Sequence, residues 1–319
     1  LDSEWVNRFL GTDLSRERMV EILRSLEFGV EEDGTIHVPT FRGDVLRECD
    51  IAEEIARIYG YNNIPSTLFC GGATTGGLSP VQKFEKSLCD NLQAMGLSEI
   101  CTYTFISPKL YSKILMPEDS SYRKSVVISN PLGEETSIMR TTTLPSMMEV
   151  LARNYNFRNA DVSLFEIGTV YLPKETPDQL PDEKKIVTLG LYGQVDYYDL
   201  KGIVEEILNC VGLRDYEIDA AKSAFSFHPG RTAELTLQGK WFGTLGELHP
   251  TVCKNYGIDV PVYAALLDFD TLFANRCAEK SYHPLPKYPA VSRDLALLCD
   301  DSLEVIKIEQ EIRRGCGKL

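Results

Sequence analysis

Residues 232–246 read Thr-Ala-Glu-Leu-Thr-Leu-Gln-Gly-Lys-Trp-Phe-Gly-Thr-Leu-Gly and contain two expected strands, 232–238 and 241–246. The turn Gln238-Gly239-Lys240 joins them as in a hairpin. On either side we expect further strands at 100–106, 126–129, 163–171, 186–192 and 263–269, and helices at 80–95, 144–156 and 200–211. Strands outnumber helices and short turns join several of them. This pattern favours an antiparallel sheet flanked by helices over a doubly wound parallel sheet.

The first 69 residues have the pattern of a small helical module. One helix should be capped by Asp13 or Ser15 and end near Gly29, and its apolar face consists of Met19, Ile22, Leu23 and Leu26. A short strand is expected at 35–38, before Pro39. A second helix should end at Gly60, with an apolar face formed by Ile51, Ile55, Ile58 and Tyr59. Two short helices with small strands predict a helix-turn-helix-like (winged) module.

The chain divides into three expected domains of an α+β protein. A Gly- and Thr-rich stretch at 71–79, just before Pro80, is the best candidate for a linker. We therefore expect the small module at 1–69 and the antiparallel-sheet domain at 70–283. The pattern changes again in a Pro-rich entry to 284–319, with a strand near 294–298 and a helix near 304–314. One strand and one helix make an incomplete unit.

Composition excludes several classes of protein. Hydrophobic residues make up 43% of the 319 residues and charged residues 25%, which is usual for a globular protein without membrane spans. The net charge of -14 works against broad binding to a phosphate backbone, which needs clustered Lys and Arg. The nine cysteines are odd in number and never spaced C-x-x-C, so we expect reduced thiols in a cytosol. Because the chain does not begin with Met, we expect an internal piece.

Four acidic residues form the sharpest polar cluster: Asp44, Asp50, Glu53 and Glu54. On a helix, positions 50, 53 and 54 are spaced i, i+3 and i+4, so Asp50 shares a face with at least one Glu. Several converging carboxylates suit Mg²⁺, which prefers oxygen ligands. Acidic residues are also favoured in the first turn of any helix, and Arg57 is placed to pair with Glu53. Spacing alone leaves the metal site and the ion pair both open.

The sequence lacks the other motifs that carry chemistry. It has neither the phosphate-binding loop G-x-x-x-x-G-K-[ST] nor the dinucleotide fingerprint G-x-G-x-x-G. His228 and His249 each precede a proline in a turn-like sequence, where a hydrogen bond to the backbone is the default. Neither has a recognisable Ser or Cys nucleophile. We therefore predict no catalytic and no cofactor-binding residue in this chain.

A long run of residues resembles phenylalanyl-tRNA synthetase beta chains. Arg42-Gly43-Asp44 is followed at 50–65 by Asp-Ile-Ala-Glu-Glu-Ile-Ala-Arg-Ile-Tyr-Gly-Tyr-Asn-Asn-Ile-Pro, which resembles the small module that precedes the catalytic-like domain of that family. Shorter segments are similar to the family in the same order: Asn130-Pro131-Leu132, Met139-Arg140-Thr141-Thr142, Leu164-Phe165-Glu166-Ile167-Gly168, His228-Pro229-Gly230-Arg231 and Gly246-Glu247-Leu248-His249-Pro250. Residues 286–297 look like the start of its ferredoxin-fold anticodon-binding domain.

The resemblance implies a supporting role in a class II ligase that joins phenylalanine to tRNA(Phe). The family's enzyme is a cytoplasmic alpha2-beta2 tetramer, without membrane attachment, in which the alpha subunit uses ATP and Mg²⁺. The resemblance also implies a Mg²⁺ site on the carboxylates that match Asp44, Asp50, Glu53 and Glu54, shared with the alpha subunit. Class II chemistry needs arginines from F-R-x-E and G-x-G-x-x-R motifs, and neither motif occurs in the catalytic-like region here. We therefore expect a degenerate synthetase-like domain that is inactive alone.

Two other functions remain as alternatives. One is a self-sufficient ATP-dependent ligase built on the same sheet. The other is an acidic helix-turn-helix-like nucleic-acid-binding or assembly module, which the negative charge disfavours. Phe41-Arg42-Gly43-Asp44 superficially matches F-R-x-E/D, but it follows Pro39 at a turn and not within a long strand. We therefore interpret Arg42 as a surface or interface residue.

Overall fold

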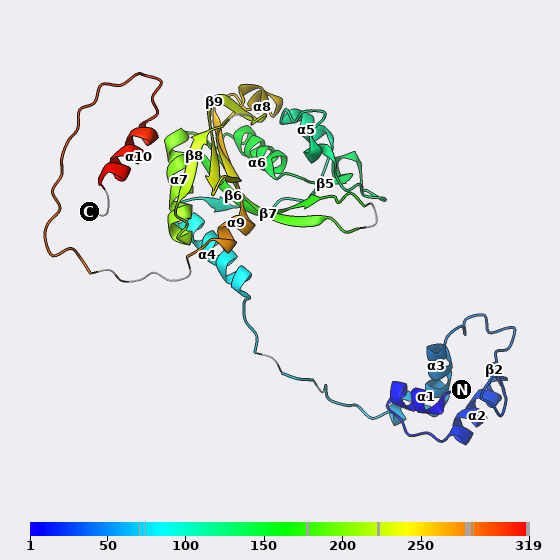
Figure 1. Cartoon of the computed structure of the whole chain (residues 1–319). Coiled ribbons are helices and arrows are strands. Elements are labelled where there is room, and N and C mark those ends of the chain that lie inside the picture. The colour runs from blue at the N-terminus through cyan, green and yellow to red at the C-terminus, as the bar shows by residue number, and fades with distance from the viewer. Residues whose placement is uncertain are drawn as a thin grey trace. The chain divides into compact units, whose positions relative to one another are not determined.

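The computed structural model describes residues 1–69, 71–73, 75–176, 179–221, 224–277, 282 and 284–316. The chain forms two compact units, Leu1–Gly77 and Leu78–Leu319 (Figure 1). Each unit has its own hydrophobic core.

The described part of the first unit contains three α-helices and a two-stranded hairpin. The helices are α1 (Ser3–Leu10), α2 (Arg16–Ser25) and α3 (Glu48–Tyr59), and a short 3-10 helix, η1 (Tyr61–Asn63), follows. The hairpin pairs β1 (Gly29–Val30) with β2 (Ile36–His37). Sequence patterns predicted α2 and α3 but not α1. The residue that marks the start of α1 is its N-cap, Asp2. The Asp2 carboxylate accepts a hydrogen bond from the Trp5 backbone N–H at 3.0 Å.

The periodic apolar side chains of α2 and α3 pack together in the core of the first unit. Met19 and Ile22 of α2 and Ile55 of α3 are almost fully buried. The N-cap of α2 is Ser15, one of the two expected residues. The predicted end at Gly29 is wrong, because α2 ends at Ser25 and Gly29 already pairs in the hairpin. Glu27 takes the left-handed conformation between them.

The second unit is built on a seven-stranded sheet. The strand order is β3-β6-β7-β11-β10-β9-β8. The bounds are β3 (Ser98–Glu99), β6 (Val162–Leu172), β7 (Asp182–Tyr192), β8 (Tyr216–Ala220), β9 (Phe227–Leu237), β10 (Lys240–Leu248) and β11 (Val262–Asp268). Adjacent strands from β6 to β8 are antiparallel, whereas β3 is parallel to β6. The prediction of an antiparallel sheet is therefore wrong at one edge. The long connection between β3 and β6 contains α6, and it lets β6 run in the same direction as β3.

Helices cover both faces of this sheet (Figure 1). One face packs against α4 (Pro80–Ala94), α7 (Tyr197–Val211) and α9 (Phe269–Ala274). The other packs against α5 (Lys109–Lys113), α6 (Leu144–Asn156) and α8 (Pro250–Asn255). Side chains alternate along each strand, so Leu189 belongs to the first core and Tyr192 to the second. The two cores place the sheet at the centre of the unit.

Several short elements differ from the sequence-based expectation. The expected strand 100–106 is reduced to β4 (Phe105–Ile106), which pairs with β5 (Ile138–Met139) in a separate sheet. Within 126–129 only an isolated bridge forms, between Val127 and Ile138. The short 3-10 helices η2 (Ser121–Arg123) and η3 (Glu134–Thr136) occupy the same region. Strand β8 was not predicted.

The predicted strand at 294–298 does not form. No strand occurs in the described part of 284–316, and a lone extended segment has no neighbour for its backbone hydrogen bonds. The predicted helix is present as α10 (Val305–Cys316), and none of its described residues is buried. The ferredoxin-like unit therefore remains a prediction.

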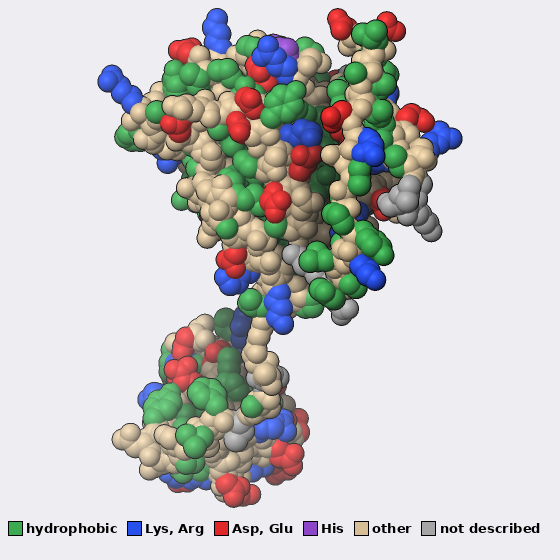
Figure 2. Space-filling model, turned by 90° about the vertical axis from the view of Figure 1, so that its left-hand side faces the viewer, with side chains coloured by type: hydrophobic (Ala, Val, Ile, Leu, Met, Phe, Trp, Pro, Cys, Tyr) green, Lys and Arg blue, Asp and Glu red, His purple; other side chains and the backbone are tan. Residues whose placement is uncertain are grey.

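The described residues include no helix that is both long enough and apolar enough to span a bilayer. On the face drawn in Figure 2, acidic and basic side chains are interspersed and not gathered by sign. The described side chains on this face form no continuous basic surface of the kind that binds a phosphate backbone.

Candidate functional site

The predicted metal residues lie at the start of α3 and in the loop before it. Asp50, in the first turn, accepts hydrogen bonds from the backbone N–H groups of Leu46 and Arg47 at 2.8 and 2.7 Å. These bonds hold the pKa of Asp50 below its usual range. The Asp50 carboxylate therefore caps the helix and fixes the loop that leads into it.

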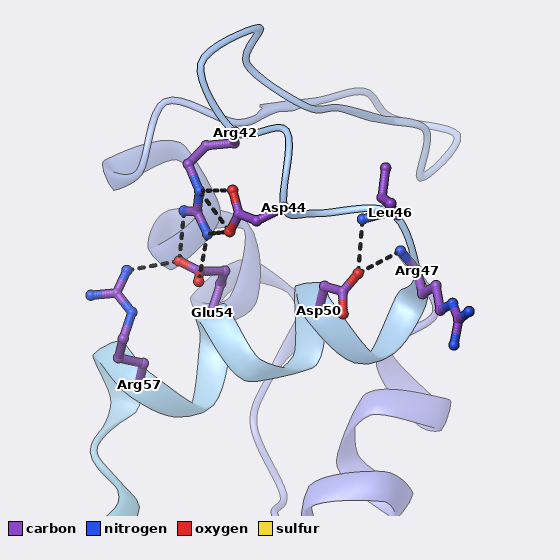
Figure 3. Close-up of polar contacts among 7 residues, drawn as sticks. All are labelled: Arg42, Asp44, Leu46, Arg47, Asp50, Glu54 and Arg57. Atoms are coloured by element: carbon purple, nitrogen blue, oxygen red, sulfur yellow. Dashed lines mark hydrogen bonds and ion pairs between the residues drawn. The ribbon is translucent and has the colours of Figure 1, made fainter. Parts of the chain in front are cut away.

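Arg42 gathers two of the four predicted carboxylates (Figure 3). Its guanidinium donates to both oxygens of Glu54, at 3.0 and 2.9 Å, in a bidentate pair. It also donates to Asp44, with Nη2 at 2.6 Å from Oδ2. The Glu54 side chain is only 7% exposed, whereas that of Asp44 is 62% exposed. Arg42 therefore joins the loop to the buried face of α3.

The Arg42 guanidinium governs the ionisation of both partners. Its hydrogen bonds lower the pKa of Asp44 and of Glu54 to about 2 each, and Arg57 adds to the effect on Glu54. The same contacts, led by Asp44, raise the pKa of Arg42. All these groups are therefore charged at neutral pH.

The structure arranges the four predicted ligands in separate places. Asp44 and Glu54 share Arg42, Asp50 binds the backbone, and Glu53 is exposed. Spacing left a pair between Arg57 and Glu53 open as an alternative; in the structure Arg57 instead donates to Glu54 at 2.7 Å, one turn earlier on the same side of α3. Among the residues described, no group of three or more His, Cys, Asp or Glu is arranged to hold a metal ion.

Arg42 is the residue whose role the sequence pattern missed. We interpreted it as a surface or interface side chain, but its side chain is 21% exposed and lies 5.8 Å from the Phe28 ring centroid. The spacing of Arg42 to Asp44 gave a local signal for their pair. The contact with Glu54, twelve residues later, depends on how the loop folds over α3.

Acidification should destabilise the first unit through this cluster. In the folded chain the pKa values of Asp44 and Glu54, about 2 each, lie below the ordinary values of 3.8 and 4.5 for these side chains. The stabilisation is therefore fully present above about pH 5 and is lost as the pH falls through about 4 toward 2. We expect the denaturant midpoint of Trp5 fluorescence, measured in a Trp241→Phe variant, to fall over this range. In an added Arg42→Ala variant the fall should be smaller; an equal fall would contradict the assignment.

A second polar cluster lies inside the larger unit. Arg140 and Glu166 are 1% and 3% exposed, and Nη2 lies 3.0 Å from Oε1. Arg140 also donates to the Thr102 hydroxyl and to the Thr169 carbonyl, at 2.6 and 2.9 Å. A Cβ at position 168 would collide with the guanidinium, which explains the glycine in Leu164-Phe165-Glu166-Ile167-Gly168. The cluster ties β6 to the segments before α6.

His228 and His249 have the structural roles expected from sequence. His228 Nδ1 accepts from the Gly230 backbone N–H at 3.1 Å, and His249 Nδ1 accepts from Thr251 N–H at the start of α8. The Arg231 side chain pairs with Glu247 at 2.7 Å. These residues stabilise turns and the sheet.

Two family models match the chain in succession. Residues 1–61 match the tRNA synthetase B5 domain, and residues 64–269 match the phenylalanyl tRNA synthetase beta chain CLM domain. In the larger unit the fold is similar to solved structures of pyrrolysyl-tRNA synthetase from Desulfitobacterium hafniense. For one of these the TM-score is 0.50 at 18% identity, over 60% of this chain and 67% of that chain. The larger unit is thus a mixed α+β domain with a class II synthetase-like fold.

Curated relatives match over the whole length of this chain. The phenylalanine–tRNA ligase beta subunits of Clostridium tetani and Clostridium acetobutylicum are 47% and 44% identical to it over 100% of the chain. The beta subunit of Listeria monocytogenes is 36% identical over 98% of it. The chain spans about two fifths of the length of these relatives, 41%, 41% and 40% respectively. With the family model covering residues 64–269, the chain belongs to the phenylalanyl-tRNA synthetase beta chain family.

Proposed function

We propose that this chain is the part of a phenylalanine–tRNA ligase beta subunit that supports the alpha subunit without performing the chemistry. The observation that carries the proposal is the match to ligase beta subunits over the whole chain. The alternative of an acidic helix-turn-helix-like nucleic-acid-binding or assembly module has no comparable support.

The ion pairs of Arg140 and Arg231 agree with a non-catalytic role. Formation of the aminoacyl adenylate in class II enzymes needs fixed cations free to face the phosphate oxygens of ATP. Arg140 is buried and fully engaged with Glu166, Thr102 and Thr169. Arg231 pairs with Glu247. Both ion pairs stabilise the fold, and burial keeps the Arg140 guanidinium away from any nucleotide.

The domain assignment is part of the proposal. The module at 1–69 would be a helix-turn-helix-like (winged) unit built from α2, α3 and the hairpin. The domain at 70–283 would be the degenerate synthetase-like part. Residues 284–319 would begin a ferredoxin-fold anticodon-binding domain. The exposed apolar side chains of α10 support this, because they need a partner surface.

The proposed partners are the alpha subunit, in an alpha2-beta2 tetramer, and tRNA(Phe). In this arrangement the alpha subunit uses ATP, and the assembly is cytoplasmic because the reaction serves protein synthesis. The negative charge of this chain makes extensive tRNA contact through it unfavourable, so tRNA binding would fall largely to other parts of the enzyme.

Co-expression with the alpha subunit from the same organism tests this function. We expect the two chains to co-purify and to elute together on size exclusion, with a mass measured by light scattering above that of either chain alone. The expected control is an unrelated class II synthetase subunit, which should not co-purify. Separate elution of the two correctly folded chains would contradict the proposal.

Mg²⁺ does not fit the four carboxylates as they stand in this chain. The guanidinium of Arg42 occupies the space between Asp44 and Glu54 where a shared cation would lie. Asp50 is turned to backbone N–H groups. We infer that Asp44, Asp50, Glu53 and Glu54 hold Mg²⁺ only in the assembled enzyme, with ligands shared by the alpha subunit, after Arg42 has released them.

Removing Arg42 should therefore strengthen Mg²⁺ binding to the isolated chain. We expect weak binding by the unmodified chain and roughly tenfold tighter binding by Arg42→Ala, since one competing charge is lost. Calorimetric titration with Mg²⁺, repeated with Mn²⁺ and paramagnetic resonance, measures it. Arg18→Ala is the matched control, because Arg18 pairs with Glu21 on α2. Equal affinity in both variants would count against competition by Arg42.

A further inference from the structure

We propose that a cavity on the sheet of the larger unit binds a small organic ammonium compound with an apolar body. The cavity has a volume of about 360 Å³. It lies on the face that packs against α6, between strands β6, β7, β9, β10 and β11 and the segment that contains Ile114 and Tyr122. This proposal is independent of the supporting role in the ligase.

The size and lining of the cavity suit a small molecule. Pockets for small ligands usually enclose a few hundred Å³ and are mostly apolar with a few placed polar groups. Here the apolar part of the lining includes Leu144, Val170, Leu172, Ile186, Phe225 and Leu266. Such a lining binds a hydrocarbon or aromatic body by burying its surface.

The charge of the cavity lining decides which polar group the ligand carries. Glu234 on β9 lines the cavity, is half-buried, and lies opposite Thr244 of β10 and Asp219 of β8 in the sheet register. Within the described ranges, no hydrogen bond or ion pair to the Glu234 carboxylate is found. Directly opposed like charges destabilise a sheet. A cation placed beside Glu234 would relieve this repulsion.

The other charged groups of the cavity point to the same conclusion. Asp268 adds a second carboxylate, one oxygen of which accepts from the Thr271 backbone N–H at 2.7 Å. Among the described residues of the lining, Lys184 is the one cation, and it pairs with Asp270 at 3.4 Å. The described lining is therefore net negative. It disfavours phosphates and carboxylates and favours an ammonium group.

Trp241 supplies an aromatic face to the lining of the cavity. Its indole Nε1 donates to the Thr244 hydroxyl at 3.0 Å, which fixes the ring beside the strand that faces Glu234. The side chain is 47% exposed and lines the cavity. An ammonium group near an indole face gains cation–π attraction in addition to its contact with the carboxylate.

Fluorescence of Trp241 reports directly on this site. The chain has two tryptophans, so Trp5→Phe leaves Trp241 as the sole indole. We expect phenethylamine to change its emission saturably with one molecule bound per chain. Glu234→Gln in the same background should weaken binding about tenfold. Glu183→Gln is the matched control, because Glu183 is exposed on β7 and outside the lining; it should leave binding unchanged.

Two further ligands test, without any change to the cavity, whether the lining prefers an ammonium group to a carboxylate. 3-Phenylpropionate has a similar apolar body with a carboxylate, and phenylalanine adds a carboxylate to the amine. We expect each to bind at least tenfold more weakly than phenethylamine. Equal or tighter binding of either probe, binding of ATP in competition with phenethylamine, or no saturable response to phenethylamine would overturn the proposal. So would unchanged affinity in a folded Glu234→Gln variant.

Discussion

Replacing Arg140 with Ala is expected to lower the free energy of unfolding of the larger unit by about 3–5 kcal/mol, because it leaves a buried carboxylate without its cation. Glu166 is 3% exposed, and after the change only the Thr102 hydroxyl and backbone N–H would remain to bind it. The Thr169 carbonyl would also lose its donor. Few single substitutions in this unit should cost as much.

Chemical denaturation followed by Trp241 fluorescence, in a Trp5→Phe background, measures this loss. Lys86→Ala is the matched control, since Lys86 forms an exposed pair with Asp90 on α4, and it should leave the midpoint essentially unchanged. The double variant Arg140→Met with Glu166→Leu should recover part of the stability, because it removes both charges from the interior. Unaltered stability of the folded Arg140→Ala variant would show that the ion pair does not hold β6 in place.

The isolated chain should form no phenylalanyl adenylate. Each missing transition-state donor costs about 10²–10³ in rate, and the sequence lacks the motifs for two phosphate-binding arginines. We therefore expect phenylalanine-dependent ATP–pyrophosphate exchange at least about 10⁴-fold below that of the enzyme assembled with its alpha subunit.

This second prediction needs a preparation free of the host's alpha subunit. Mass spectrometry of the purified chain establishes that purity, and adding the cognate alpha subunit should restore exchange. Exchange by the pure chain, in proportion to its concentration, would support a self-sufficient ligase built on this sheet. It would then be necessary to find cations other than Arg140 and Arg231 that face the phosphates.

The longer elements were predictable from sequence because their signals are local. The alternation that predicted strands 163–171 and 186–192 corresponds to β6 and β7, and the apolar faces that predicted helices 144–156 and 200–211 correspond to α6 and α7. Shorter elements were not predicted, because two or three residues are too few to show the periodicity of a helix or of a strand. Strand β3, of two residues, exists only because β6 accepts its hydrogen bonds.

The candidate carboxylates were identified by spacing, but their environment was not. Helical periodicity placed Asp50 and Glu54 on α3, as found. It could not show that Asp50 would bind the backbone of the loop at Leu46 and Arg47. The chain path between Pro39 and α3 decides this, and no periodic pattern describes that path.

The sequence by itself determined where the longer strands and helices lie, which family's motifs they carry, and which charged residues are candidates for a site. These properties depend on the order of neighbouring residues and on their propensities. Only the tertiary structure decided that Arg42 binds Glu54, that Arg140 lies buried against Glu166, and that Glu234 lines a cavity with Trp241. Each of these contacts joins residues on separate elements, and their distances are set by how those elements pack around a core and not by their separation along the chain.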